Sequence, residues 1–82
     1  MTLYETELGK KYMVTEIQVS NNIKRRIYDI GLVDGSRVVP LFKSFLGEPT
    51  AYFIRGAVVA LRREEAEKIY VEPIERGGKY HG

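Results

Sequence analysis

The chain has 82 residues, of which 44% are hydrophobic and 29% charged, a balance typical of one soluble globular domain rather than of a disordered or membrane-spanning chain. Its net charge of +2 is too small to imply a nucleic-acid partner by itself, and the absence of cysteine excludes disulfides, thiolate metal sites and a cysteine nucleophile. Because no apolar run approaches the roughly 20 residues of a membrane span and the first residues do not resemble a secretory signal, we expect a cytoplasmic protein that is neither exported nor inserted in a membrane.

The first predicted elements are a strand and a short helix. Residues 12–19 combine apolar positions with β-favouring neighbours in an imperfect alternation, which predicts a strand with a bulge. A helix is expected over about residues 22–30, because isoleucines recur there at the spacing of one helical face. These isoleucines are Ile23, Ile27 and Ile30.

Both ends of this helix carry recognisable signals. Asn21 and Asn22 are the candidate N-caps, since a short polar side chain can accept hydrogen bonds from the first free N–H groups. Gly31 stands where a left-handed C-terminal cap needs a residue without Cβ, and Leu32 can close that cap by an apolar contact. Residues 33–35 have the composition of a turn that ends in Gly35.

A second strand is predicted over residues 37–43. Pro40 lies inside it and cannot donate a ladder hydrogen bond, so we expect Pro40 at a sheet edge or at a bulge. An exposed edge there could pair with a second copy of the chain, although proline often blunts such edges, and homo-oligomerisation stays open. Residues 46–49 are expected to form a loop.

The second half of the chain contains a hairpin and a last strand. Two apolar runs at residues 51–54 and 58–61 flank residues 55–57, which have the composition of a tight hairpin connection. Residues 62–68 are too polar and too short for an independent helix and predict a single turn. The last strand is expected over residues 69–72.

Together these elements predict a mainly β fold, a small closed or nearly closed antiparallel barrel of about five strands with one short helix between the first two strands. One domain is expected over residues 1–75. The folded part is predicted to end near Ile74, and residues 76–82, three of which are glycine, are expected to form a flexible tail.

The residues that carry chemistry are few. His81 is the only histidine and falls in the predicted tail, so neither a nucleophilic triad nor a zinc site with four N or S ligands can be assembled, and we expect no enzyme and no cofactor. A weak site of oxygen ligands, or a metal site completed between subunits, stays open. Gly47 and Gly56 are too isolated to form a phosphate-binding loop.

Nucleic-acid binding is the alternative function that the composition allows, because small barrels can stack bases on aromatic side chains and pair phosphates with arginines. The aromatic candidates are Tyr28, Phe45, Tyr52 and Phe53. Against this, most of the nine aromatic residues in so small a barrel belong in the core and at its rim, and the basic run at residues 24–26 is short.

Four short motifs, in this order and spacing, resemble the ferrous iron transport protein A (FeoA) family. They are RIYDIGLVDG at residues 26–35, LGEP at 46–49, RG at 55–56 and LRREEA at 61–66. The family pattern is a helix ending in Arg-Leu-x-x-x-Gly-Leu-x-x-Gly, then Leu-Gly-Asp-Pro, Arg-Gly and Leu-Arg-x-x-Glu-Ala. The chain departs from it at Ile27, at Glu48 and at Pro40 inside the second strand.

The resemblance implies an SH3-like barrel that works as a small cytosolic accessory of bacterial ferrous iron uptake. Its implied partner is ferrous iron transport protein B (FeoB), a transmembrane GTP-binding transporter. The same barrel resembles the C-terminal domain of iron-dependent repressors, but no helix-turn-helix precedes it here, so operator binding is not expected. The motif residues for which we expect structural roles are Gly31, Leu32, Gly35, Gly47, Pro49 and Gly56.

A protein of this kind acts by binding, and the middle of the chain offers a surface for an acidic partner. Residues 24–63 carry eight basic and three acidic residues, whereas both flanking segments are net acidic. We expect docking through the exposed helix face and two arginine-containing turns. The candidate residues are Lys24, Arg25, Arg26, Asp29, Arg55, Arg62 and Arg63.

Overall fold

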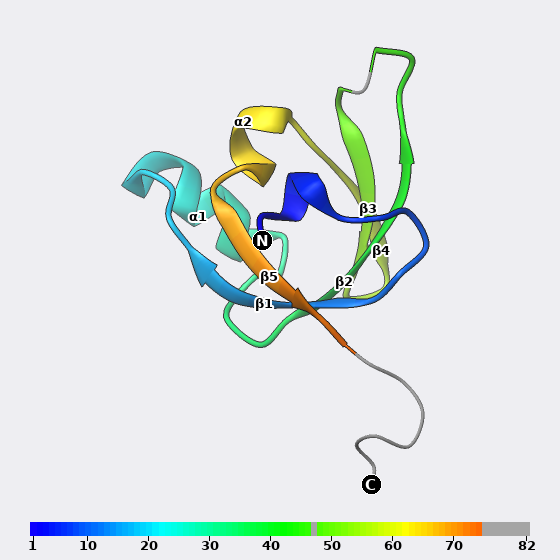
Figure 1. Cartoon of the computed structure of the whole chain (residues 1–82). Helices are drawn as coiled ribbons and strands as arrows, with labels where there is room; N and C mark the ends of the chain where they lie inside the picture. Colours follow the sequence, from blue (N-terminus) through cyan, green and yellow to red (C-terminus); the bar gives the residue numbers. More distant parts are fainter. Residues whose placement is uncertain (47, 75–82) are drawn as a thin grey trace, which may run out of the picture.

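The computed structural model describes residues 1–46 and 48–74, which form one five-stranded antiparallel sheet (Figure 1). The strands are β1 (Tyr12–Ile17), β2 (Arg37–Lys43), β3 (Thr50–Ile54), β4 (Ala57–Leu61) and β5 (Ile69–Pro73). The helical elements are the 3-10 turn η1 (Leu3–Glu5) and the helices α1 (Asn21–Asp29) and α2 (Arg63–Ala66). The strand order is β4-β3-β2-β1-β5, so β4 and β5 are the two edges of a strongly curled sheet.

A single core fills the inside of the curl. Every helical element contributes at least one fully buried apolar residue, namely Leu3 from η1, Ile27 from α1 and Ala66 from α2. The strands supply the rest, and Tyr52 of β3 is the largest buried side chain. Burial of these side chains is the main favourable contribution to folding. A chain of this size has little apolar surface beyond what this core uses.

The helix α1 agrees with the prediction, but its N-terminus differs. Ser20 is the N-cap residue, and Asn21 and Asn22 lie in the first turn, so the assignment of the two asparagines as N-caps was wrong. The Ser20 side chain makes no capping hydrogen bond, and its carbonyl accepts the first helical bond from Lys24 at 2.8 Å. The start of α1 is therefore fixed by the chain path out of β1 rather than by a side-chain cap.

The C-terminus of α1 is closed as expected. Gly31 has φ +96, and its N–H donates to the Tyr28 carbonyl at 2.9 Å. The Leu32 N–H donates to the Ile27 carbonyl at 3.1 Å, and the Leu32 side chain is fully buried. This hydrogen-bond pair defines a Schellman motif, which needs a residue that tolerates the left-handed conformation. The following turn also forms, and Gly35 has φ +89.

Two bulges bend the sheet. The predicted bulge in β1 lies between Val14 and Glu16, where the pairing with β5 shifts. In β2 the pairing with β3 shifts between Pro40 and Phe42, and the Pro40 carbonyl accepts the Gly9 N–H at 2.7 Å. Because β2 lies between β1 and β3, Pro40 marks a bulge and not an edge strand. Pro40 is also fully buried and its carbonyl is already bonded to Gly9, so Pro40 itself offers no exposed edge to a second copy.

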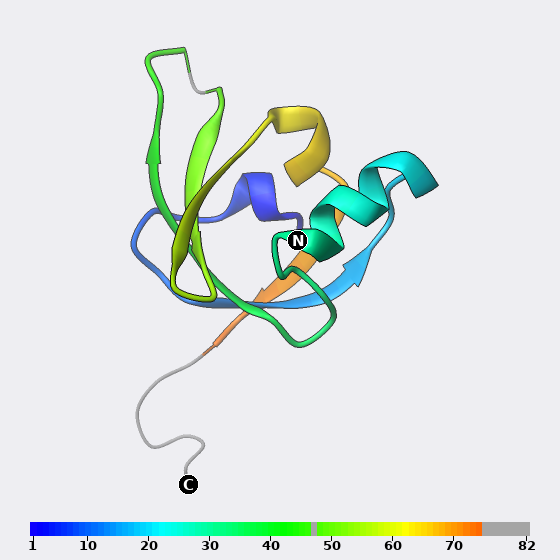
Figure 2. The same cartoon turned by 180° about the vertical axis from the view of Figure 1, so that it is seen from behind.

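The two hairpins of the sheet differ. The β3–β4 hairpin closes through only Arg55 and Gly56, which have φ +51 and +85, the two positive values that a type I′ turn requires. The β2–β3 hairpin is longer and projects beyond the rest of the molecule in both views (Figures 1 and 2). Its connection exposes Phe45 and Leu46 almost completely.

The remaining predictions agree with the structure within one residue at the ends of each strand, except that β1 stops at Ile17 instead of residue 19. The turn predicted at residues 62–68 contains the single-turn helix α2. The sequence reading missed η1, whose Leu3 is fully buried. The predicted tail at residues 76–82 and the boundary at residue 75 lie outside the described residues.

Candidate partner-binding site

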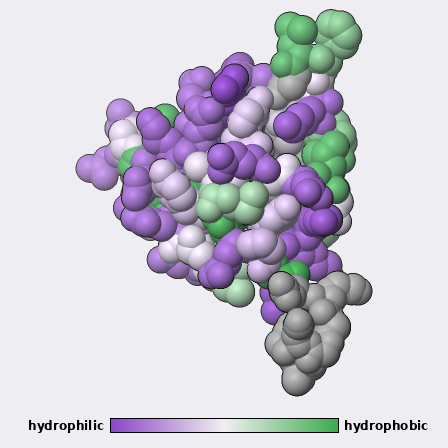
Figure 3. All heavy atoms as spheres, in the orientation of Figure 1, coloured by the Kyte–Doolittle hydropathy of each residue, from purple (hydrophilic) through white to green (hydrophobic). Residues whose placement is uncertain are grey.

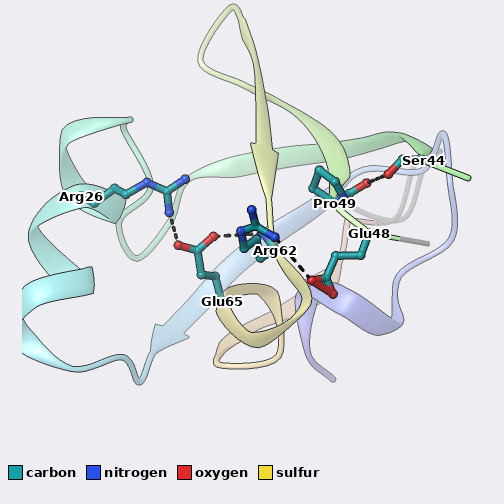
Figure 4. A network of polar contacts seen from close by, with 6 residues as sticks. All are labelled: Arg26, Ser44, Glu48, Pro49, Arg62 and Glu65. Atoms are coloured by element: carbon teal, nitrogen blue, oxygen red, sulfur yellow. Dashed lines mark hydrogen bonds and ion pairs between the residues drawn. The ribbon is translucent and has the colours of Figure 1, made fainter. Parts of the chain in front are cut away.

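Charged residues from different motifs meet at the junction of α1 and α2 (Figure 4). The Glu65 carboxylate is paired with the Arg26 guanidinium and also accepts the Arg62 backbone N–H at 3.0 Å. Glu65 is 8% exposed, so its charge is largely withdrawn from water. The carboxylate thus caps α2 and ties it to α1, two roles that explain why a glutamate stands three residues after the start of this turn.

The network continues toward the β2–β3 connection. The Arg62 side chain lies 3.8 Å from the Glu48 carboxylate, and both groups are partly exposed. The Pro49 carbonyl accepts hydrogen bonds from the Ser44 N–H at 3.1 Å and from the Ser44 hydroxyl at 2.7 Å. These bonds close the base of the hairpin, and they give Pro49 a structural role (Figure 4). Gly47, between these residues in sequence, lies outside the described part of the chain.

Arg63 lies against Tyr4 of η1. Its guanidinium is 4.9 Å from the centre of the Tyr4 ring, and the Lys43 ammonium is also 4.9 Å from this centre. The Arg63 Nε–H donates to the Glu67 carboxylate at 2.8 Å, and this hydrogen bond raises the pKa of Arg63. Cation–π contact and ion pairing together hold Arg63 on its own chain.

A groove lies where the C-terminal end of α1 faces the β3–β4 turn. It has a volume of about 460 Å³, and its lining includes Tyr28, Asp29 and Ala57. The Arg55 side chain lies across Gly31, so closely that a Cβ built on Gly31 would be 2.4 Å from the Arg55 Cδ. The positive φ of Gly31 is what favours glycine at this position, since the flexible Arg55 side chain can move away from a Cβ.

The seven candidate docking residues thus fall into three sets. Arg26, Arg62 and Arg63 each pair with an acidic side chain of their own chain. Asp29 and Arg55 share the groove. The other two, Lys24 and Arg25, lie on α1, where the Lys24 ammonium is 5.8 Å from the centre of the Tyr28 ring and Arg25 is exposed. The structure does not gather the seven into one continuous basic face.

The aromatic candidates for base stacking are separated in the same way. Tyr52 is 1% exposed, so the expectation that it could stack on a base is wrong, and burial raises its pKa to about 12. Tyr28 is on α1, Phe45 is in the β2–β3 connection and Phe53 is on β3. All three are exposed, and they come from three different parts of the fold.

Neither a metal cluster nor a membrane helix occurs in the part of the chain that the structure describes. Residues 1–46 and 48–74 contain no group of three or more His, Cys, Asp or Glu side chains that could hold a metal ion. No helix among them is long and apolar enough to cross a bilayer.

Sequence reasoning missed Glu65, Glu48 and Tyr4 as members of this arrangement. A signal for Glu65 was available, because a glutamate three residues after a helix start is the usual partner of the N-cap backbone. The contact between Arg26 and Glu65 joins residues 39 positions apart, and nothing in the local sequence indicates it.

The structure is a small domain built on a strongly curled β-sheet, and several residues of the four sequence motifs contact one another. A family model described as the FeoA domain matches residues 1–73. The chain belongs to the FeoA family.

Solved structures with the same fold support this assignment. The FeoA protein of Chlorobium tepidum is 34% identical and superposes with a TM-score of 0.87, covering 100% of this chain and 79% of that one. FeoA of Stenotrophomonas maltophilia, in complex with zinc and described as a prokaryotic SH3 domain protein, is 33% identical with a TM-score of 0.77, covering 88% and 89%. The expected SH3-like architecture is confirmed. The manganese-activated repressor ScaR, 22% identical with a TM-score of 0.80, shares the fold.

A curated relative joins this domain to a transporter. It is the Fe(2+) transport protein A/Fe(2+) transporter FeoB fusion protein of Porphyromonas gingivalis, 32% identical over 74 residues. The alignment covers 90% of this chain and 9% of the relative, so the chain spans about a tenth of that protein's length.

Proposed function

We propose that this chain is a small cytoplasmic accessory protein of bacterial ferrous iron uptake that docks on the membrane GTP-binding transporter FeoB. The observation that carries the proposal is the Porphyromonas gingivalis fusion, in which one polypeptide contains both a domain similar to this chain and the transporter. A covalent fusion raises the effective concentration of two partners for each other, which favours domains that act on one another.

The chemistry of the described residues supports a binding role rather than catalysis. Arg26 and Arg62 of the motifs are paired with Glu65 and Glu48, and the buried Tyr52 has a pKa of about 12, far above the range useful for proton transfer near neutral pH. A protein of this kind acts on a partner by binding one of its conformations more tightly than another. The effect on the transporter can be no larger than that difference in affinity.

For the electrostatic part of docking we propose the exposed side of α1 together with the groove. Lys24, Arg25 and Arg55 take part in none of the ion pairs formed among the described residues. They therefore offer their charges to an acidic partner without breaking an ion pair of the fold. Arg26, Arg62 and Arg63 would first have to leave their own carboxylates.

The test is a titration of the full 82-residue chain against the full-length cognate transporter in lipid nanodiscs. We expect saturable binding that weakens when Lys24 and Arg25 are both replaced by alanine, with the melting temperature nearly unchanged. The matched control is the double replacement of Lys10 and Lys11, which removes the same charge from the segment before β1.

A single-stranded oligonucleotide is titrated in parallel at physiological salt. Binding to the oligonucleotide alone, with a steep loss of affinity as salt rises, would replace docking on the transporter by nucleic-acid binding as the function. Equal binding by the wild type and by the Lys24 and Arg25 double variant would exclude the α1 face from the contact.

A further inference from the structure

We propose that the free edge of β4 accepts an extended segment of the transporter as an added strand, and that a carboxylate of this segment binds Arg55 in the adjoining groove. The proposal deepens the proposed function and rests on it. It concerns how the partner is held rather than whether there is one.

The edge of β4 has unused backbone hydrogen-bonding groups. The two-residue turn makes Ile54 and Ala57 the pair that exchanges hydrogen bonds, and such pairs alternate along an antiparallel ladder. Ala57, Val59 and Leu61 therefore direct their N–H and C=O groups to β3, while Val58 and Ala60 direct theirs away from the sheet. Among the described residues, no hydrogen bond from outside the sheet reaches these outward groups.

Nothing in the strand itself protects this edge. Residues 57–61 read AVVAL, with no charge and no proline, and their pairing with β3 runs without a shift. Natural edge strands usually carry a lysine, a proline or a bulge that prevents pairing with another chain. Five residues without any of these form a template for strand addition.

The outer face beside this edge is also apolar. Cross-strand pairing aligns Val39, Phe53 and Val58 in one row and Phe42, Ala51 and Ala60 in the next. Val58 is 61% exposed, and Phe42 and Phe53 are 57% and 43% exposed. Apolar residues also gather over the β2–β3 connection and along the side of the molecule below it (Figure 3). An added strand would cover part of this face, which a monomer leaves in water.

The charge at one end of β4 selects the occupant. Arg55 precedes the strand and forms no ion pair among the described residues, whereas Arg62, which follows the strand, lies 3.8 Å from the Glu48 carboxylate. The segment with matching chemistry is extended, small or β-branched in its middle and acidic at the end that meets Arg55. At the Arg55 end the edge adjoins the groove of about 460 Å³, which Ala57 and the acidic Asp29 also line, and Arg55 is the cation there that can pair with the acidic side chain.

A second copy of this chain matches the edge less well. If β4 paired with itself in antiparallel fashion about Val59, Ala57 would face Leu61, and Arg62 of each copy would lie beside the Arg55–Gly56 turn of the other. Arginines would then approach one another at both ends of the ladder, which destabilises such a pairing. Charge complementarity therefore favours an acidic segment of another protein.

The primary test is hydrogen exchange of the full chain with and without the full-length transporter in nanodiscs. Strand addition predicts that exchange of the Val58 and Ala60 amides slows by about tenfold or more on binding, because these N–H groups gain acceptors. If the transporter binds and both amides exchange as in the free chain, the proposal is overturned. Protection that appears without the transporter and grows with protein concentration would assign the edge to a second copy instead.

Two substitutions test the contact directly. Val58→Pro removes an outward N–H without removing a bond to β3 and should weaken binding about tenfold, whereas Val58→Ala keeps the N–H and should change binding much less. Arg55→Asn keeps a residue that accepts positive φ and removes the cation, so binding should weaken in a folded chain even if Val58→Pro does not fold. Unchanged binding by Arg55→Asn would remove the carboxylate contact from the proposal.

A capped peptide, Asp-Val-Thr-Val-Thr-Val-Asp, separates failure of this proposal from failure of the proposed function. If the transporter does not bind but the peptide protects the Val58 and Ala60 amides, the edge site stands and docking on the transporter falls. If neither protects them, strand addition is wrong.

Discussion

The two edges of the sheet are built in opposite ways. The outer edge of β5 is covered by the beginning of the chain, where Thr2 pairs with Tyr70 and the Val71 N–H donates to the Met1 carbonyl at 2.9 Å. β5 also contains Glu72 and ends at a proline. The edge of β4 has no cover among the described residues, no charge and no proline. Folding thus protects one edge by contacts with the N-terminal residues and leaves the other available.

Because only the β5 edge is covered, changes at the β5 edge should affect stability and changes at the β4 edge should affect binding. Contacts that cover β5 reach the core through Leu3, so a change there should affect the free energy of unfolding. Side chains that point outward from β4 touch little, so a change there should affect association and leave stability nearly constant. The predictions below are ordered by the size of their expected effect on stability.

Removing the anchor of the covered edge should have the largest effect. Leu3 is fully buried, and Leu3→Ala should lower the free energy of unfolding by about 2–5 kcal/mol, because the substitution loses apolar contact and leaves a cavity. Urea denaturation measures this change. The control is Leu8→Ala, which alters a residue 49% exposed and should change stability by no more than about 0.5 kcal/mol. Equal effects would show that η1 does not secure the edge.

The second largest effect on stability is expected in α2, the helix that connects the two edge strands. α2 joins β4 to β5, and Glu65→Ala removes both its N-terminal cap and its ion pair with Arg26. We expect a loss of about 1–3 kcal/mol in urea denaturation, the range for charged hydrogen bonds that are partly buried. Glu64→Ala, in the same turn but exposed, is the control. Glu65→Gln should recover part of the loss, since an amide oxygen can still accept the Arg62 N–H.

Alkaline pH should weaken the side of the core that contacts the covering segment. The Tyr52 hydroxyl donates to the Leu3 carbonyl at 3.5 Å, and burial raises the Tyr52 pKa from 10.0 to about 12. The unfolded chain releases this proton near pH 10 and the folded chain near pH 12, so the stabilisation is complete below pH 10 and is lost as pH rises between these values.

The expected slope from this group is a fall of about 1.4 kcal/mol for each pH unit in that interval. Urea denaturation of the wild type and of Tyr52→Phe at pH 9 and pH 11 isolates it, because every other group is common to both proteins. If the two proteins lose the same stability over this interval, Tyr52 does not titrate abnormally.

The smallest change in stability is expected at the free edge. Val58→Lys gives β4 the charge that natural edges carry, and it should change the free energy of unfolding by no more than about 0.5 kcal/mol while weakening transporter binding. Val59→Lys is the matched control on the opposite face, where the side chain packs against the core. Stability should fall for Val59→Lys and binding for Val58→Lys, and the reverse pattern would contradict the assignment of the two faces.

Local chemistry made much of this fold predictable. The spacing of Ile23, Ile27 and Ile30 identified α1, and Gly31 and Gly56 identified a helix end and a hairpin turn, because each signal lies within a few residues of the structure that it specifies. The 3-10 turn η1 was missed, since three residues are too few to show a period.

The features that depend on tertiary pairing could not be predicted in the same way. The sequence of β4 shows an uncharged strand, but only the strand order shows that it is an edge. The asparagines at the start of α1 match the preferred N-cap residues, yet the path from β1 places Ser20 there. The sequence does not distinguish the basic residues of the candidate surface from one another. Only the fold shows that Arg26, Arg62 and Arg63 are paired with carboxylates.

The contact of Glu65 with Arg26 and with the Arg62 backbone has an evolutionary consequence. A nearly buried carboxylate that loses its guanidinium is left as an uncompensated charge, so a mutation at either position alone is selected against more strongly than the joint change. Positions 26 and 65 should therefore covary among FeoA domains: lineages without a basic residue at position 26 should also have a neutral residue at position 65. The bond from position 62 to the same carboxylate comes from the backbone N–H and does not depend on the side chain there.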